Sequence, residues 1–145
     1  MQILERLKPL SLLLLRLALG VIFIHHGYPK LFGNVHHEAQ QFAAMGFPGF
    51  FAPFAGVIEF FGGLLLIAGL FTRIAGILLA GEMFVALWRV HRLFADPMAV
   101  QHYEFPLALC VGAFVVATAG PGIVSLDHLI YGSGQGAGRK PKSKG

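Results

Sequence analysis

Six formally charged side chains lie within or at the edges of the long apolar segments of this chain. They are Arg16, Lys30, Arg89, Glu59, Glu82 and Glu104. A lone charge at the centre of a bilayer costs about 2.5–3.5 kcal/mol on insertion scales. Because three positive charges face three negative ones, we expect ion pairs, a neutralised Glu or a wet cavity to reduce that cost. Ionisable residues inside a membrane are by default candidates for function.

Proton transfer is the chemistry that these residue types support best. A histidine with carboxylates in an apolar pocket can donate protons to, and accept them from, a bound small molecule. The candidate catalytic residues are therefore His26, Glu59 and Glu82, with Glu82 as a relay. The expected pocket or ion-pair partners are Arg16, Lys30, Arg89, His91 and Glu104. No residue here carries an electron by itself, so redox chemistry requires a cofactor or a partner subunit.

The histidines and the cysteine favour neither a metal ion, nor haem, nor dithiol chemistry. His25 and His26 point about 100° apart on a helix and cannot both face one metal ion. Residues 36–38 (HHE) could bind a metal, but a solvated loop explains them better. Haem between His26 and His91 is disfavoured, and we expect no metal site. The single cysteine, Cys110, excludes a disulfide or a dithiol relay within the chain. From these residue types alone the cofactor is unknown.

The composition indicates that lipid surrounds these residues. Only 12% of the 145 residues are charged and 56% are hydrophobic, whereas soluble domains carry about 25% charged residues. The mean hydropathy is +0.70, and the 14 Phe and 19 Gly suit closely packed membrane helices. The net charge of +4 forms no basic face, because four of the 11 Lys and Arg lie within residues 139–144. That tail fits anionic lipid headgroups better than nucleic acid.

Four apolar segments predict the helices that position the charged residues. Their bounds are about 9–32, 54–71, 74–90 and 104–119. Short connections between them favour an all-α, antiparallel, integral membrane four-helix bundle that fills residues 1–131. A short interfacial helix is expected between the first two, at HHEAQQFAAM. A simple hydropathy window would undercount the spans because of their charges, and residues 132–145 predict a disordered basic tail.

Glycines are expected to let these helices approach one another. Arg16 and Lys30 share one face of the first segment with two glycines between them. Glu59 lies one turn from two further glycines of the second segment, where small residues allow close contact. The expected packing positions are Gly20, Gly27, Gly62 and Gly63. The alternative interpretation of the whole charged set is that its ion pairs only fix helix register.

The distribution of Lys and Arg predicts the orientation in the membrane. Seven lie on the side of the termini and three on the other side, so both termini should be cytoplasmic. A pocket formed by the charged faces would then open outward and narrow toward Glu82. The first apolar run could imitate a signal peptide, but Arg16 interrupts it and no cleavage site of small residues follows. We therefore expect a retained first helix.

Short motifs along most of the chain resemble the DoxX family of membrane proteins. They are RLALGVIFIHHGYPKLFG, FAAMGFPGFFAPFAGVIEFFGGLLLIAGLFTRIAG, AGEMFVALWRVH, YEFPLALCVGAF and GPGIVSLD, within residues 10–127. The resemblance implies a four-helix protein of the bacterial cytoplasmic membrane. The family includes proteins that resemble subunits of a thiosulfate:quinone oxidoreductase and of a terminal quinol oxidase, and others linked to oxidative-stress complexes with soluble partners. By motif match the family positions are Arg16, His26, Gly27, Lys30, Glu59, Gly62, Gly63, Arg73, Glu82, His91, Glu104 and Asp127.

Three roles fit these observations. The first, which the resemblance implies, is a subunit or accessory of a quinone-linked membrane oxidoreductase, embedded in lipid with protein partner subunits and with a quinone as the candidate cofactor. The second is a non-catalytic membrane subunit that anchors or stabilises a larger complex. The third, a small transporter or proton pathway, is disfavoured because no inverted repeat is evident. A ligand among His26, Glu59 and Glu82 would favour the first role, and a dry core with every Glu paired would favour the second.

Overall fold

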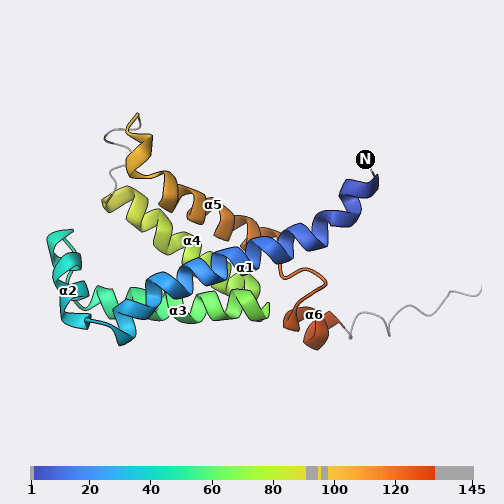
Figure 1. Ribbon diagram of the computed structural model, residues 1–145, viewed down its shortest axis with the longest axis horizontal. Helices are drawn as coiled ribbons and strands as arrows, with labels where there is room; N and C mark the ends of the chain where they lie inside the picture. Colours follow the sequence, from blue (N-terminus) through green and yellow to red (C-terminus); the bar gives the residue numbers. More distant parts are fainter. Residues whose placement is uncertain (1, 91–94, 96–97, 133–145) are drawn as a thin grey trace, which may run out of the picture.

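The computed structural model describes residues 2–90, 95 and 98–132, and in these residues all regular secondary structure is helical (Figure 1). The helices are α1 (Gln2–Phe32), α2 (Val35–Ala44), α3 (Phe51–Ala68), α4 (Thr72–Arg89), the 3-10 turn η1 (Val100–His102), α5 (Glu104–Ala119) and α6 (Leu126–Tyr131). The predictions for His91 and for the tail beyond residue 132 fall outside the described residues. The all-helical prediction is confirmed for the part that is described.

Two of the described helices, α1 and α3, are long and apolar enough to cross a membrane by length and composition. The sequence predicted four spans. Helix α5 is apolar but has 16 residues, and α4 carries Arg73, Glu82 and Arg89 within its 18 residues. Because α5 is short and α4 is charged, they do not have the combination of length and apolar composition that α1 and α3 have.

Helices α1 and α3 pack so closely that only glycine fits at their contact. A Cβ on Gly20 would lie 2.8 Å from the carbonyl oxygen of Gly63, and a Cβ on Gly63 would lie 2.7 Å from that of Gly20. Farther along, a Cβ on Gly27 would lie 2.5 Å from the backbone nitrogen of Phe60. Rising residue numbers on α1 therefore meet falling numbers on α3, and this register places the C-terminal half of α1 beside the N-terminal half of α3.

Helices α4 and α5 pack through a second glycine contact and close the hydrophobic core. A Cβ on Gly76 would lie 2.9 Å from the carbonyl oxygen of Ala113, while the Cys110 thiol donates a hydrogen bond to Ala80 at 3.4 Å. Gly62 of α3 faces Leu79, to which a Cβ would come within 3.1 Å. The core that the four longest helices share includes Leu19, Phe23, Leu66, Leu79, Leu109, Ala113 and Val116.

Arg16 ties α1 to the ends of two other segments. Its side chain is 1% exposed, and Nε donates to the carbonyl oxygen of Leu66 at 3.0 Å. Nη1 donates to the carbonyl oxygens of Pro121 and of Val124, the latter at 2.8 Å, and Nη2 donates to that of Ile67 at 3.4 Å. We had expected Arg16 to pair with a carboxylate in the pocket. It binds the carbonyl groups at a helix end and in a loop instead, since these lack intrahelical donors.

Two further charged residues complete the ends of α4 and α5. Asp127 of α6 accepts hydrogen bonds from the backbone N–H groups of Phe71 at 2.8 Å and Thr72 at 3.0 Å. It thereby caps α4, whose first residues offer unpaired donors and a positive dipole end. Arg73 donates to two carbonyl oxygens in the last turn of α5, at 2.7 and 3.0 Å. The residues from 120 to 131 thus fasten one end of the molecule.

Candidate functional site

An ion pair between α1 and α3 lies at the centre of the candidate site. Lys30 Nζ donates to Glu59 Oε2, and the two side chains are 15% and 4% exposed. The glycine contact positions this pair, because a Cβ on Gly27 would come within 3.0 Å of the Glu59 Cβ. Removing one partner of a buried pair costs about 3–5 kcal/mol, since the other charge is then left uncompensated.

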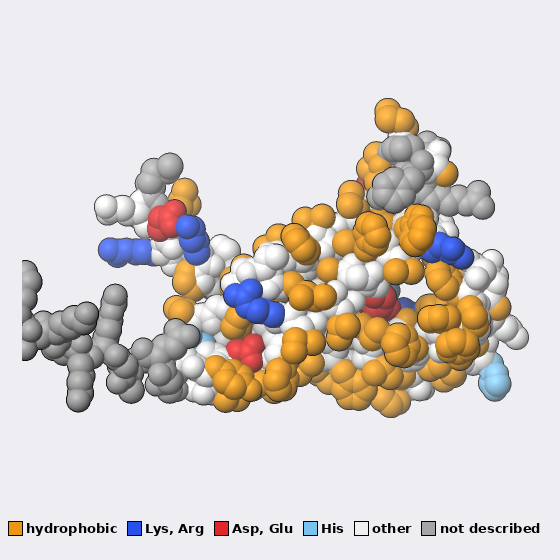
Figure 2. Space-filling model, turned by 180° about the vertical axis from the view of Figure 1, so that it is seen from behind, with side chains coloured by type: hydrophobic (Ala, Val, Ile, Leu, Met, Phe, Trp, Pro, Cys, Tyr) orange, Lys and Arg blue, Asp and Glu red, His pale blue; other side chains and the backbone are white. Residues whose placement is uncertain are grey.

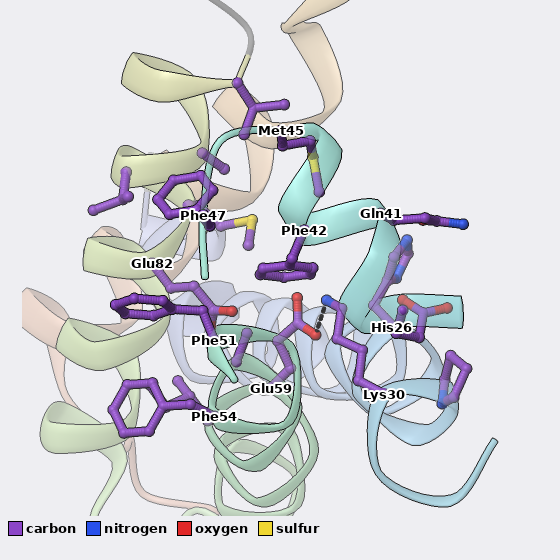
Figure 3. A pocket seen from close by; sticks show the side chains of 18 of the residues that line it. His26, Lys30, Gln41, Phe42, Met45, Phe47, Phe51, Phe54, Glu59 and Glu82 are labelled. Carbon is purple, nitrogen blue, oxygen red and sulfur yellow. Dashed lines mark hydrogen bonds and ion pairs between the residues drawn. The ribbon is translucent and has the colours of Figure 1, made fainter. Parts of the chain in front are cut away.

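A cavity of about 590 Å³ lies beside the ion pair, with walls from α1, α2, α3 and α4 (Figure 3). This volume is within the range of small-molecule sites, about 300–1,000 Å³, which are mostly apolar with a few polar groups. The polar lining consists of His25, His26, Lys30, Glu38, Gln41, Glu59 and Glu82. The apolar lining includes Phe42, Met45, Phe47, Phe51, Phe54 and Ile58.

Glu82 reaches the cavity from α4 and lacks a complete set of hydrogen bonds. Its Oε2 atom is buried and has no hydrogen-bond partner among the described residues. Figure 3 shows Glu82 of α4 and Glu59 of α3 directed into the same space. A buried polar atom without a partner costs about 1–3 kcal/mol. A polar ligand atom bound between the two carboxyl groups would remove that cost, by donating to a carboxylate or by accepting from a protonated carboxyl group.

His26 lines the same cavity from α1, but it is exposed rather than buried. Its Nδ1 lies 2.8 Å from the carbonyl oxygen of Ile22. A carbonyl can only accept, so Nδ1 carries the proton and Nε2 of the neutral ring is left as an acceptor. The ring also packs against Phe105 of α5, with 5.6 Å between the ring centroids. These contacts hold the imidazole with one free nitrogen at the cavity rim.

Helix α2 and the loop after it cover the cavity. This cover was not predicted from the sequence. Figure 3 shows the Phe42 ring above the ion pair, and Lys30 Nζ lies 5.8 Å from the ring centroid. Met45, three residues later, also lines the cavity. This spacing was a readable signal, because residues three apart share one face of a helix. We had predicted an interfacial helix here without assigning its apolar face to the site.

Three members of the expected charged set do not line the cavity. Arg89 is exposed at the end of α4, with its guanidinium carbon 5.9 Å from the centroid of the Phe47 ring, which does line it. Glu104 is exposed in the first turn of α5, and Arg16 lies near the middle of α1, where it binds carbonyl groups outside the cavity. Of the six charged residues that were expected to cluster, three therefore line the cavity. The residues that meet at the cavity are His26, Lys30, Glu59 and Glu82.

Comparison with known proteins identifies the family. A profile of the DoxX family matches residues 11–92. The chain belongs to the DoxX family. It is 30% identical over 126 residues to the inner membrane protein YqjF of Escherichia coli K12, which covers 87% of this chain and 96% of that protein. It is 35% identical over 119 residues to a Bacillus subtilis protein named "Putative oxidoreductase CatD", which covers 82% and 86%.

The names of YqjF and of a mycobacterial relative describe membrane proteins, whereas that of CatD describes an oxidoreductase. The "Uncharacterized membrane protein Rv3486" of Mycobacterium tuberculosis is 28% identical over 132 residues, with 83% of this chain and 81% of that protein covered. No solved structure matches the chain. The DoxX match at residues 11–92 contains every residue that lines the cavity, from His25 to Val90. This DoxX chain is a membrane protein, and its cavity lies within the family's matched region.

The ligand types that a DoxX cavity of this kind could hold follow from its lining. The described residues contain no group of three or more His, Cys, Asp or Glu side chains able to hold a metal ion. Four phenylalanine rings and three carboxyl groups surround the space. A flat apolar molecule with polar atoms at its edge fits such a lining.

Proposed function

We propose that this DoxX chain is a component of a quinone-linked membrane oxidoreductase and that the cavity receives the quinone headgroup. The observation that carries the proposal is the unpartnered Oε2 of Glu82 in an apolar cavity, opposite the buried Lys30–Glu59 pair. The name of CatD contains the word oxidoreductase, which supports the class of reaction.

Conversion of a quinone to a quinol takes up two electrons and two protons, one proton at each oxygen. Lys30 can donate a hydrogen bond to one carbonyl oxygen, and a protonated Glu82 can donate to the other. Glu59 lies between these two groups and would pass protons between them, while Nε2 of His26 would accept a proton at the rim. The residues of the site carry no electrons, so the electrons come from a partner subunit or a cofactor.

We propose that α1, α3, α4 and α5 form an antiparallel four-helix membrane bundle. All four share one hydrophobic core, and α4 and α5 present exposed apolar side chains such as Ile77, Val111 and Phe114 on their outer faces. At a rise of 1.5 Å per residue α4 and α5 are about 27 and 24 Å long, close to the hydrocarbon thickness of a bilayer. Residues 1–131 would form this domain in the bacterial inner membrane, with α2 at the outer interface and both termini cytoplasmic.

Replacement of Glu82 by Leu tests the proposed site. Glu82→Leu should weaken binding of decylubiquinone about tenfold or more, equivalent to about 1.4 kcal/mol, because the side chain can no longer donate a hydrogen bond to a carbonyl oxygen of the quinone. Thermal unfolding should be unchanged, since Oε2 makes no hydrogen bond that the substitution would break. Quinone titration of the protein in nanodiscs measures the first quantity, and a melting curve measures the second.

Glu104→Leu is the matched control, because Glu104 is exposed and does not line the cavity. Equal quinone affinity in wild type and Glu82→Leu would remove Glu82 from the site. If wild type binds no quinone at all, the other role remains, a non-catalytic subunit that anchors or stabilises a larger complex.

A further inference from the structure

One wall of the cavity consists of hydrophobic side chains that also face away from the protein. Phe54 of α3 is 60% exposed, and Leu78 and Val85 of α4 are 51% and 42% exposed, yet all three line the cavity. Figure 2 shows an acidic side chain within a broad field of hydrophobic ones on this face. The cavity is therefore accessible from the side of the helices as well as from the end that α2 covers.

Gly81 lies in the middle of this wall and makes none of the contacts that explain the other helix glycines. A Cβ on Gly81 would meet nothing within 4 Å, whereas a Cβ on Gly20 or Gly63 would collide with the backbone of the opposite helix. Glycine inside a helix is less favourable than Ala by about 0.5–1 kcal/mol. Helix packing thus does not explain a glycine at this position. A glycine does leave the space beside it open, because it has no side chain.

The neighbours of Gly81 define a gap. Leu78 and Val85 are three residues before it and four after it, so they flank it on the same face of α4. Glu82 follows directly and directs its carboxyl group inward. The wall therefore passes, within one helical turn, from an apolar outer surface to the polar floor formed by Glu59 and Glu82.

We propose that the gap at Gly81, bordered by Phe54, Leu78 and Val85, is a lateral portal between α3 and α4 for a ligand dissolved in the membrane. The ligand class is an amphiphile with a flat polar head and a long hydrocarbon tail, whose head binds in the cavity while the tail passes Gly81 and remains in lipid. This inference rests on the proposed function for the identity of the head. A tail in that position stays among apolar groups along its whole length, so it loses no favourable solvation.

Filling the gap tests the portal. Gly81→Phe should weaken binding of decylubiquinone about tenfold or more, equivalent to about 1.4 kcal/mol. Binding of the tailless 2,3-dimethoxy-5-methyl-1,4-benzoquinone should change less than about threefold, because its head reaches the cavity without a tail in the gap. Ile77→Phe is the matched control, since Ile77 is 61% exposed on α4 and does not line the cavity. Equal losses for both quinones, or no loss for either, would overturn the portal.

A spin label at position 81 separates the portal from the identity of the head. Gly81→Cys in a Cys110→Ala background carries a single nitroxide, whose relaxation is measured in nanodiscs with oxygen and with Ni-EDDA. A portal that opens to lipid gives the larger effect with oxygen, and a larger effect with Ni-EDDA would show a mouth open to water and overturn the proposal. If wild type binds neither quinone, the proposed function fails while this measurement still decides the portal.

Discussion

A guanidinium group carries five N–H donors in a rigid fork, and Arg16 directs its donors at carbonyl oxygens from the end of α3 and from the loop before α6. Glu82 is the opposite case, because one of its buried oxygens has no hydrogen-bond partner among the described residues. An ionisable residue that makes several hydrogen bonds to the backbone, as Arg16 does, holds the structure together. One with a bond missing is available to a ligand.

Arg16 should therefore contribute to stability and not to binding. Arg16→Met leaves several carbonyl groups without a donor, and we expect a loss of about 3 kcal/mol, since single hydrogen bonds to charged groups are worth about 1.5–3 kcal/mol. Arg16→Lys should recover only part of this loss, because an ammonium cannot reproduce the fork. Thermal unfolding in detergent measures both. Unchanged quinone affinity in Arg16→Lys is also expected, and full stability of Arg16→Met would contradict the assignment.

The Lys30–Glu59 pair should couple stability with binding. Lys30→Met alone is expected to lower stability by about 3–5 kcal/mol, because Glu59 would stay buried without its cation. The double variant Lys30→Met with Glu59→Met should regain most of that stability, yet it should bind no decylubiquinone. A double-mutant cycle on the unfolding free energy measures the coupling. A double variant that still binds quinone would show that the pair only fixes helix register.

The sequence predicted which charged residues belong to the site, but not which groups each of them would bind. Lys30, Glu59 and Glu82 could be grouped because charge and depth in an apolar segment can be read from a sequence. Which carboxylate meets Lys30 depends on how the helices are rotated about their axes, and the sequence does not fix that rotation. Backbone carbonyl groups as partners of Arg16 have no sequence signature at all.

At the scale of elements, the close contact of α1 and α3 brings the site together. The contact needs glycines at facing positions, because a Cβ on either Gly20 or Gly63 would collide with the carbonyl oxygen of the other. The spacing of glycines on both segments predicted this kind of packing. The cover formed by α2 and the cap that Asp127 provides for α4 were not predicted. The start of α6, which carries Asp127, does have a sequence signal, because Ser125 is a typical N-cap residue and accepts a hydrogen bond from the backbone N–H of His128.

Alanine at a packing glycine should therefore have a different effect from alanine at the portal. Gly63→Ala would place a Cβ 2.7 Å from the Gly20 carbonyl oxygen, and we expect a loss of about 1–3 kcal/mol from the strain of overpacking. Gly81→Ala meets nothing within 4 Å and should be neutral or stabilising by up to about 1 kcal/mol through helix propensity. Melting temperatures of the two variants compare them directly. A larger loss at Gly81 than at Gly63 would contradict this description of the helix contacts.

At the scale of the whole molecule, the charges separate toward its two ends. Arg73 and Asp127 lie at the end that Arg16 fastens, and α2 covers the cavity at the end away from the N-terminus and α6 (Figure 1). The sequence predicted four spans, whereas length and composition mark α1 and α3 alone among the described helices. Charged side chains such as Glu82, which lines the cavity, also make α4 less recognisable as a membrane helix.

The predicted orientation can be measured with reporter fusions. Green fluorescent protein at the C-terminus should fluoresce, because it folds in the cytoplasm, where the excess of Lys and Arg places that end. Alkaline phosphatase fused after Gly46, in the loop that follows α2, should be active because that loop would lie outside. The reverse pattern of the two activities would invert the molecule and place the mouth of the cavity under α2 in the cytoplasm.

The bonds of Arg16 also have a consequence for how the protein is made. Two of its acceptors, the carbonyl groups of Pro121 and Val124, follow it by 105 and 108 residues in the chain. At a synthesis rate of about 5–20 residues per second, they emerge from the ribosome about 5–20 s after Arg16 does. During that interval the first helix holds a cation with part of its bonds unmade. The nascent chain therefore needs the insertion machinery, water or lipid phosphates to shelter Arg16 until its last partners arrive.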